Sequence, residues 1–261
     1  IQRGDELSTQ GYLIPTLMSD AVLNCLESLE KPLQNRQRIR LHKGTSETIG
    51  RLVLLDRDEL GPGEMGYVQL RLEKPFVAER NERFIIRGFS SMRLLGGGRI
   101  LEVYPQKNRR FRRSVLDYLE AVTDPDPDVL IEEVMRNAYG EQRLKSIQDL
   151  VCSTNLSSDI LQENVAKLEQ AGELIRFAGN QLLHRNWYDN LKDELIMVLE
   201  KMHHENRLKD MLPKDTPKSQ LSWPAPDIVY ESLLKRLGEE STKVISGRSI
   251  RLSCLLYTSP S

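Results

Sequence analysis

The stretch that most constrains the fold of this chain is RFIIRGFSSMRLLGGGRIL, residues 83–101. Its first five residues are typical of a β-strand, and a polar turn follows them. Three consecutive glycines, Gly96, Gly97 and Gly98, then open a second apolar run at Ile100. Glycine has no Cβ, so three in a row indicate a backbone that turns tightly, takes positive φ, or closely approaches another molecule. We therefore expect these glycines to lie outside ordinary strand interior.

Strand-like alternation extends through the N-terminal part of the chain. Polar and apolar residues alternate over 36–42 and again over 68–73, as in half-buried strands. Residues 52–55 are continuously apolar, which predicts a more buried strand, and LGPG at 60–63 has the composition of a turn. Several short strands separated by turns, without a long helical period, favour a closed sheet. We predict an all-β antiparallel barrel over residues 10–106.

Helical periodicity replaces this pattern after residue 107. Helices are predicted over 115–122, 129–139, 144–151 and 158–170, and a β-hairpin over 173–184 with its turn at Gly179 and Asn180. The last three of these helices, followed by the hairpin, are in the order of a winged helix-turn-helix. We assign residues 107–187 to a first winged-helix domain.

A second copy of this order follows 68 residues downstream. Helices are predicted over 191–204 and 225–237, a short helix and loop between them, and a hairpin over 242–252 that turns at Ser246 and Gly247. At the same offset Phe177 and Leu182 correspond to Ile245 and Ile250. An internal repeat of this kind indicates two similar small domains, so we assign 188–252 to a second winged helix.

Charge argues against DNA binding by these domains. The chain has 37 basic and 38 acidic residues, with 15 against 14 in 1–106 and 22 against 24 in 107–252. The helix expected to read a groove carries Asp159, Glu163 and Glu169 against the single base Lys167. Binding to a phosphate backbone needs several cations on one face. We therefore interpret the tandem domains as a spacer without a DNA partner.

The segment KNRRFRR, residues 107–113, is the exception, because five of its seven residues are basic. Two readings remain open. It is either a solvated linker with the first turn of a helix, or a hinge that contacts phosphate groups.

Several classes of site find no support in the sequence. Cys25, Cys152 and Cys254 are far apart and odd in number, which argues against a disulfide framework or a zinc site. His184 is expected to be structural, and we predict no metal site. There is no GxxxxGK[ST] loop and no arrangement typical of a catalytic centre. No apolar run approaches the ~18 residues that span a bilayer, so we expect no membrane partner and a cytoplasmic location.

Three segments also carry a family resemblance: RIRLHKGTSETIG at 38–50, LGPGEMGYVQLRLEKPF at 60–76, and the glycine-rich stretch described above. In this order they resemble the third domain of translational GTPases related to elongation factor Tu, and most closely the selenocysteine-specific translation elongation factors (SelB). In that family the barrel precedes four tandem winged helices, so this chain would hold the first two. Residues 1–9 resemble the end of the preceding second domain. The last nine residues, 253–261, fit no repeat and are expected to be a non-native or disordered tail.

The resemblance implies a function for the intact factor. It would deliver selenocysteinyl-tRNA to the ribosome at UGA codons marked by an mRNA hairpin, which the distal winged helices bind. GTP and Mg²⁺ would bind to the first domain, so this fragment would need no cofactor and would not be an enzyme. Matching positions imply that the barrel contacts tRNA through two loops and the glycines. These residues are Lys43, Gly44, Thr45, Ser46, Ser91, Arg93, Gly96, Gly97 and Gly98.

Two alternatives are compatible with the same pattern. One is a winged-helix transcriptional regulator with a β-barrel sensor domain. Tight, salt-sensitive retention of duplex DNA in a gel shift would favour it. The other is a different Tu-like translation factor, which the appended winged helices disfavour.

Overall fold

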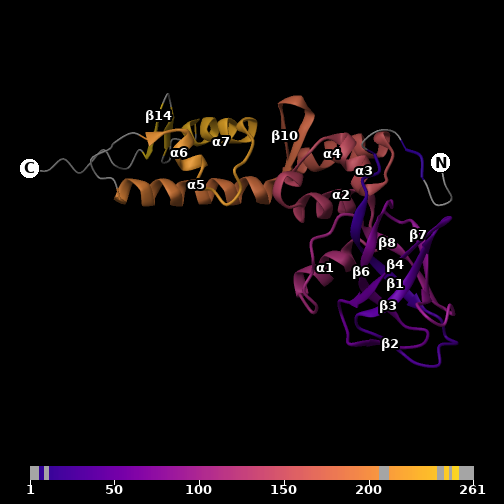
Figure 1. Ribbon diagram of the computed structural model, residues 1–261. Helices are drawn as coiled ribbons and strands as arrows, with labels where there is room; N and C mark the ends of the chain where they lie inside the picture. The colour runs from indigo at the N-terminus through magenta and orange to yellow at the C-terminus, as the bar shows by residue number, and fades with distance from the viewer. Residues whose placement is uncertain (1–5, 9–11, 206–211, 240–243, 247–248, 253–261) are drawn as a thin grey trace, which may run out of the picture. The chain divides into compact units, whose positions relative to one another are not determined.

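The computed structural model describes residues 6–8, 12–205, 212–239, 244–246 and 249–252 (Figure 1). The chain forms two compact units, which are described separately. The first comprises Ile1–Val134 and Gln148–Asn164, and the second comprises Met135–Ile147 and Val165–Ser261. The expectations for the tail at 253–261, for most of 1–9 and for the turn at Gly247 lie outside the described residues.

A closed six-stranded antiparallel barrel dominates the first unit, as the sequence predicted. The strand order is β1-β6-β4-β3-β7-β8, and a separate two-stranded ribbon, β2-β5, lies in its connections. The strands are β1 Thr16–Cys25, β2 Leu33–Gln34, β3 Gln37–Lys43, β4 Ser46–Leu54, β5 Glu59–Leu60, β6 Met65–Phe76, β7 Arg83–Gly88 and β8 Leu94–Glu102.

The alternating pattern explains why these segments form a barrel. On β3 the apolar residues Ile39 and Leu41 are almost fully buried, whereas the arginines between them reach the outside. Side chains alternate between the two faces of a strand, so a shift of one residue would expose the whole apolar set. The inward residues of all six strands form one continuous core.

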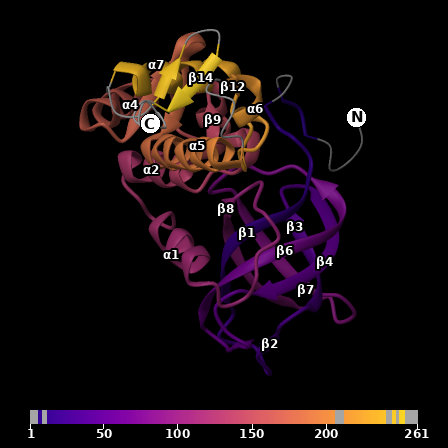
Figure 2. The same ribbon diagram turned by 90° about the vertical axis from the view of Figure 1, so that its left-hand side faces the viewer.

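Four helices follow the barrel in the sequence: α1 Arg113–Ala121, α2 Pro127–Arg136, α3 Ile147–Thr154 and α4 Ser158–Ala171. The first of them is fixed to the barrel wall (Figure 2). The fully buried Arg80 donates hydrogen bonds to the carbonyl oxygens of Leu101 and Val122, and the Tyr118 hydroxyl donates to Glu102 at 2.6 Å. Barrel and α1 therefore share buried polar contacts.

The second unit contains a long helix and two small sheets. Its remaining elements are η1 Gly140–Arg143, β9 Leu144–Lys145, β10 Leu174–Phe177, η2 Ala178–Asn180, β11 Gln181–His184, α5 Arg185–Glu205, β12 Leu212–Pro213, α6 Asp215–Lys218, α7 Asp227–Glu239, β13 Val244–Ser246 and β14 Ser249–Leu252. An apolar core joins β10 and β11 to α5 and α7, and includes Trp223 and Tyr230. No helix in the described part of the chain combines the length and apolarity that crossing a bilayer requires.

The two small sheets have the same topology. In the order β10-β11-β9, a short leading strand pairs with the second strand of the hairpin, and the order β12-β14-β13 repeats this. The leading strands β9 and β12, and likewise the second hairpin strands β11 and β14, are separated by the offset of 68 residues found in the sequence. The expected turn of the first hairpin is confirmed, since Gly179 and Asn180 both have positive φ.

Candidate functional site

The first predicted loop is the turn between β3 and β4. Gly44 and Thr45 are exposed, Ser46 is half-buried, and Gly44 has a φ of 53°, which suits glycine. Lys43, however, is only 3% exposed, and its Nζ donates to Glu82 at 2.9 Å and also to Glu6. Two carboxylates therefore hold the Lys43 ammonium group inside the first unit, so this side chain does not reach the surface.

The three glycines differ most from expectation. Gly96, Gly97 and Gly98 lie in the interior of β8, paired with β1 on one side and β7 on the other, and none has positive φ. A Cβ on Gly98 would lie 1.9 Å from the carbonyl oxygen of Val22. The close approach is thus made by a neighbouring strand within the barrel. The prediction that they lie outside strand interior is wrong, and these glycines do not form a nucleotide phosphate loop.

The second predicted loop joins β7 to β8 and is open to solvent. Ser91 is exposed, and Arg93 is 70% exposed with an ion pair to Glu30 at 2.6 Å. Two backbone hydrogen bonds with Gly88 close the turn, one of them donated by the amide of Met92. Met92 has a φ of 54°, a conformation that is uncommon for residues other than glycine. The turn therefore presents its polar side chains in a defined conformation.

Strand register separates the two loops. In the β3–β7 pair, Ile39 lies opposite Gly88 and His42 lies opposite Ile85. The turn at 89–93 consequently adjoins the start of β3, whereas the turn at 43–46 follows its end. Their attachment points lie four residues apart along β3, from Ile39 to Lys43, which is ~14 Å at ~3.4 Å per residue. The structure therefore places the predicted residues on two surfaces at opposite ends of the barrel.

Between these turns, strand pairing places outward arginines side by side. Arg38, Arg51 and Arg71 lie opposite one another on β3, β4 and β6, and Arg40 lies opposite Arg87 on β7. Adjacent like charges on one face of a sheet are unfavourable. Alternation in a sequence indicates which side chains share a face of one strand, but not that these arginines are neighbours, because register is a long-range property.

Carboxylates balance only part of this charge. Arg38 pairs with Glu73 at 2.9 Å, and Arg40 pairs with Glu47 at 2.5 Å. Neither Arg51 nor Arg87 has an ion pair within the described residues. A row of arginines with few acidic partners attracts anions.

Phe89 orders two of these guanidinium groups. The Cζ of Arg38 lies 3.9 Å from the ring centroid of Phe89, and that of Arg40 lies 5.3 Å away. Arg40 also donates a hydrogen bond to the carbonyl oxygen of Phe89 at 3.2 Å. Stacking limits the freedom of both side chains before any ligand binds.

The basic segment after the barrel is docked onto the barrel wall. We call residues 106–112 the strap. Gln69 donates to the carbonyl oxygen of Gln106 at 2.8 Å, and Arg71 donates to that of Asn108 at 3.1 Å. The strap is therefore docked on the barrel and is not a free linker, whereas phosphate contact by this segment stays a prediction.

Arg110 anchors the far end of the strap. Its guanidinium donates to the carbonyl oxygens of Leu54 at 2.8 Å and Arg57 at 2.6 Å, and it pairs with Asp58 at 2.6 Å. The amide of Phe111 donates to the carbonyl oxygen of Leu55 at 2.7 Å.

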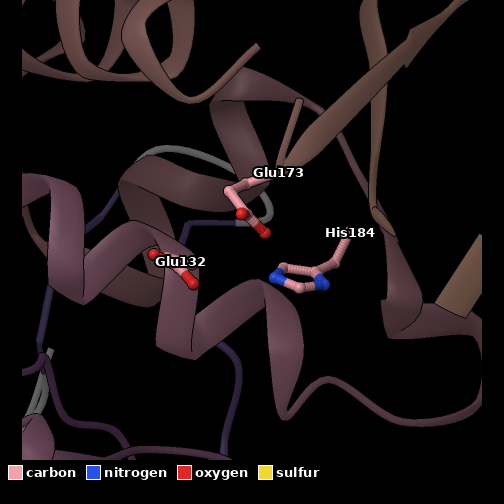
Figure 3. Close-up of side chains that lie close together, drawn as sticks. All are labelled: Glu132, Glu173 and His184. Carbon is pink, nitrogen blue, oxygen red and sulfur yellow. The ribbon is translucent and has the colours of Figure 1, made fainter. Parts of the chain in front are cut away.

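His184, at the end of β11, is fully buried and close to Glu173 in the same unit (Figure 3). Its Nδ1 accepts a hydrogen bond from the amide of Asn186 at 3.1 Å. Burial, and then the charge of Arg136, lower the pKa of His184 to about 4. The imidazole is therefore neutral at pH 7, and the structural role expected for His184 stays a prediction. Glu132, also drawn, belongs to the first unit, and two ligand groups do not define a metal site.

Comparison with known proteins identifies the barrel. Residues 20–107 match the family model "Selenocysteine-specific elongation factor, beta-barrel domain". The barrel is of the SelB β-barrel type. The SelB factor of Desulfomicrobium baculatum is 34% identical over 167 residues, which are 63% of this chain and 26% of that protein. The Haemophilus influenzae factor is 27% identical over 120 residues, or 46% of this chain and 19% of that protein.

A solved structure extends the likeness in fold. A bacterial selenocysteine-specific elongation factor, EF-Sec, superposes with a TM-score of 0.64 at 17% identity, covering 93% of this chain and 35% of that one. The chain spans about a quarter of the length of the Desulfomicrobium baculatum factor. The transcriptional regulator considered above finds no support in these comparisons.

Proposed function

We propose that this chain is the barrel and proximal arm of a factor that delivers selenocysteinyl-tRNA to the ribosome at UGA codons marked by an mRNA hairpin. The match of residues 20–107 to the SelB barrel carries this proposal. In the intact factor, GTP and Mg²⁺ act in another domain, and distal winged helices bind the hairpin. The chain described here has a binding role without catalysis, and it acts in the cytoplasm, where translation takes place.

Within this function, the barrel contacts tRNA through its exposed turns and the arginine row between them. Gly44, Thr45 and Ser46 offer backbone amides and hydroxyls at one end, and Ser91 and Arg93 offer hydroxyl and guanidinium groups at the other. Contacts to phosphates and 2′-hydroxyls need these groups and no base readout. Lys43 and Gly96–Gly98 support the surface from within, since their positions are buried or paired.

The two domains that follow the barrel form a spacer. Residues 107–187 and 188–252 repeat one topology, and their acidic helices do not suit a phosphate backbone. We assign them the boundaries expected from the sequence, with 10–106 as the barrel.

Binding of a selenocysteine tRNA transcript tests the tRNA contacts. We expect Arg93→Ala at one turn and Thr45→Asp at the other each to weaken binding several-fold, the first by losing a cation and the second by adding repulsion. Lys201→Ala, which removes an exposed cation from α5, is the matched control and should leave affinity unchanged. If both turn variants bind as tightly as the parent chain, the turns do not contact tRNA.

A further inference from the structure

The strap has two kinds of residue. Asn108 and Arg110 are half-buried and hold it to the barrel, whereas Lys107, Arg109 and Arg112 are exposed. None of these three cations forms an ion pair within the residues that the structure describes. Asp58, an acidic group beside the strap, is paired with Arg110. The strap therefore presents three cations that are not compensated.

A buried polar network fixes the strap in place. The Asn108 amide donates to Asp20 Oδ2 at 2.7 Å, and the Gln69 amide donates to Asp20 Oδ1 at 2.8 Å. Arg71 in turn donates to Gln69 Oε1 at 2.8 Å, which orients that amide. Asp20 is 2% exposed and Gln69 is fully buried, although both lie on the outer wall of the barrel.

Such a network is costly for a simple connector. Burial of a carboxylate is unfavourable, and here it raises the pKa of Asp20 to about 8 despite its two amide donors. A flexible linker would need none of these groups. The network instead gives the strap one conformation, and so reduces the conformational entropy that its exposed cations would lose on binding a partner.

The strap also continues the arginine row. Arg71, the last residue of the row on β6, donates to the Asn108 carbonyl oxygen. The segment that bears the exposed strap cations therefore adjoins the arginine row at Arg71.

We propose that Lys107, Arg109 and Arg112 form a preformed binding surface for the phosphodiester backbone of an RNA stem. This inference rests on the proposed function and adds a contact outside the two predicted turns. The phosphates belong either to the tRNA or to the mRNA hairpin, which share this chemistry. Uncompensated cations on a backbone that the barrel holds in place, beside further arginines, suit a phosphate backbone that carries one charge per nucleotide.

A charge-matched pair of triple variants tests the surface. Lys107→Gln with Arg109→Gln and Arg112→Gln removes the strap cations. Lys31→Gln with Lys74→Gln and Lys201→Gln removes three exposed cations elsewhere. Affinity for a duplex RNA stem is measured against salt concentration. We expect the strap variant to bind at least ~10-fold more weakly, with a salt slope reduced by about 2 to 3, since each phosphate contact contributes about 0.9.

Two further binding measurements identify which RNA supplies the phosphates. Affinities for a selenocysteine tRNA transcript and for an isolated mRNA hairpin are compared in the parent chain and the strap variant. The RNA with the larger loss of affinity is the ligand of the strap. Equal affinity of the parent and strap variant for every RNA overturns the proposal, as does a loss equal to that of the control triple. A loss confined to a polyglutamate peptide also overturns it, because the partner would then be an acidic protein.

The role of the network is tested by Asn108→Ala, which releases the strap and keeps every cation. We expect RNA affinity to fall about 3- to 10-fold with an unchanged salt slope. Trypsin should cut faster at 107–113 than in the parent chain, while the unfolding midpoint of the barrel reports that the fold is retained. The matched control is Asn190→Ala on the exposed face of α5. Faster cleavage without any change in RNA affinity would show that fixing the strap has no part in binding.

Failure of this inference is distinguishable from failure of the proposed function. If the parent chain binds no RNA, the assigned RNA contacts of the barrel fail as a whole. If the parent chain binds and the turn variants weaken binding, but the strap variant does not, the strap inference alone fails.

Discussion

The barrel and the second unit bury polar side chains in different ways. In the barrel, Asp20, Gln69 and Arg80 are buried on the wall or in its connections, and each hydrogen-bonds to a segment that crosses the barrel. The second unit is held by an apolar core, and its fully buried polar residue His184 is kept neutral. Polar burial in the barrel thus positions other segments, whereas in the second unit apolar packing provides the cohesion.

The largest expected loss of stability comes from adding a side chain at a glycine of the barrel. Gly98→Ala would place a methyl group 1.9 Å from the Val22 carbonyl oxygen, so a backbone strand must move. We expect a loss of about 3 kcal/mol or more in the unfolding free energy of the barrel. Hydrogen exchange of β8 would measure it. Unchanged protection would show that the barrel is more plastic than its register implies.

The stabilities of the barrel and of the second unit are expected to depend on pH in opposite directions. Asp20 has a folded-state pKa of about 8, above its unfolded value near 4, so its contribution to stability is complete below ~pH 4 and is lost as pH rises through 8. His184 has a folded-state pKa of about 4, below its unfolded value near 6.5. Its contribution is complete above ~pH 6.5 and is lost as pH falls through 4, by up to about 3 kcal/mol.

Denaturant unfolding from pH 4 to 9 separates the stability contribution of Asp20 from that of His184. Trp187 and Trp223 both lie in the second unit, so their fluorescence reports on that unit, and hydrogen exchange of β1 reports on the barrel. Asp20→Asn should flatten the pH profile of the barrel, and His184→Gln should flatten that of the second unit. Parallel profiles in the two units of the parent chain would contradict this assignment.

A smaller effect of opposite sign is expected at Gly238 in α7. A Cβ there would meet no atom within 4 Å. Gly238→Ala should therefore stabilise the second unit by up to about 1 kcal/mol, because alanine loses less conformational entropy in a helix. Tryptophan fluorescence in a denaturant titration would show a higher midpoint. A destabilised variant would mean that this part of α7 is not helical in solution.

The smallest effect concerns an exposed ion pair. Glu30→Gln breaks the contact with Arg93, in which both side chains are at least 70% exposed. We expect the stability of the barrel to change by less than about 0.5 kcal/mol, because solvent screens such pairs. Thermal unfolding of the parent and variant would measure it. A loss above 1 kcal/mol would indicate that the ion pair orders the whole β7–β8 turn.

The sequence predicted where the strands and helices lie along the chain better than it predicted which backbones lie next to one another. Alternation in β3 and β6 and the 68-residue offset between hairpins are local or periodic signals, and the barrel and the repeated topology confirm both. The prediction for the three glycines was wrong because close approach of a second backbone is compatible with strand interior. In a closed barrel, the neighbouring backbone is itself the close contact.

Burial of single charged groups was beyond the sequence. Lys43 alternates as an inward residue on β3, but its partners Glu6 and Glu82 are far away in the chain. The strap presents the same difficulty, because its basic composition hides the anchoring roles of Asn108 and Arg110. Such roles depend on side chains from other strands, and no local pattern encodes them.

Each small sheet of the repeated domains takes all its strands from its own copy. The leading strand, β9 or β12, completes the hairpin that follows it, so neither copy borrows a strand from the other. A copy could consequently be added or removed without leaving an unpaired edge in its neighbour. The hydrogen bonds of either sheet can thus form without strands from the other, although the second unit shares one apolar core.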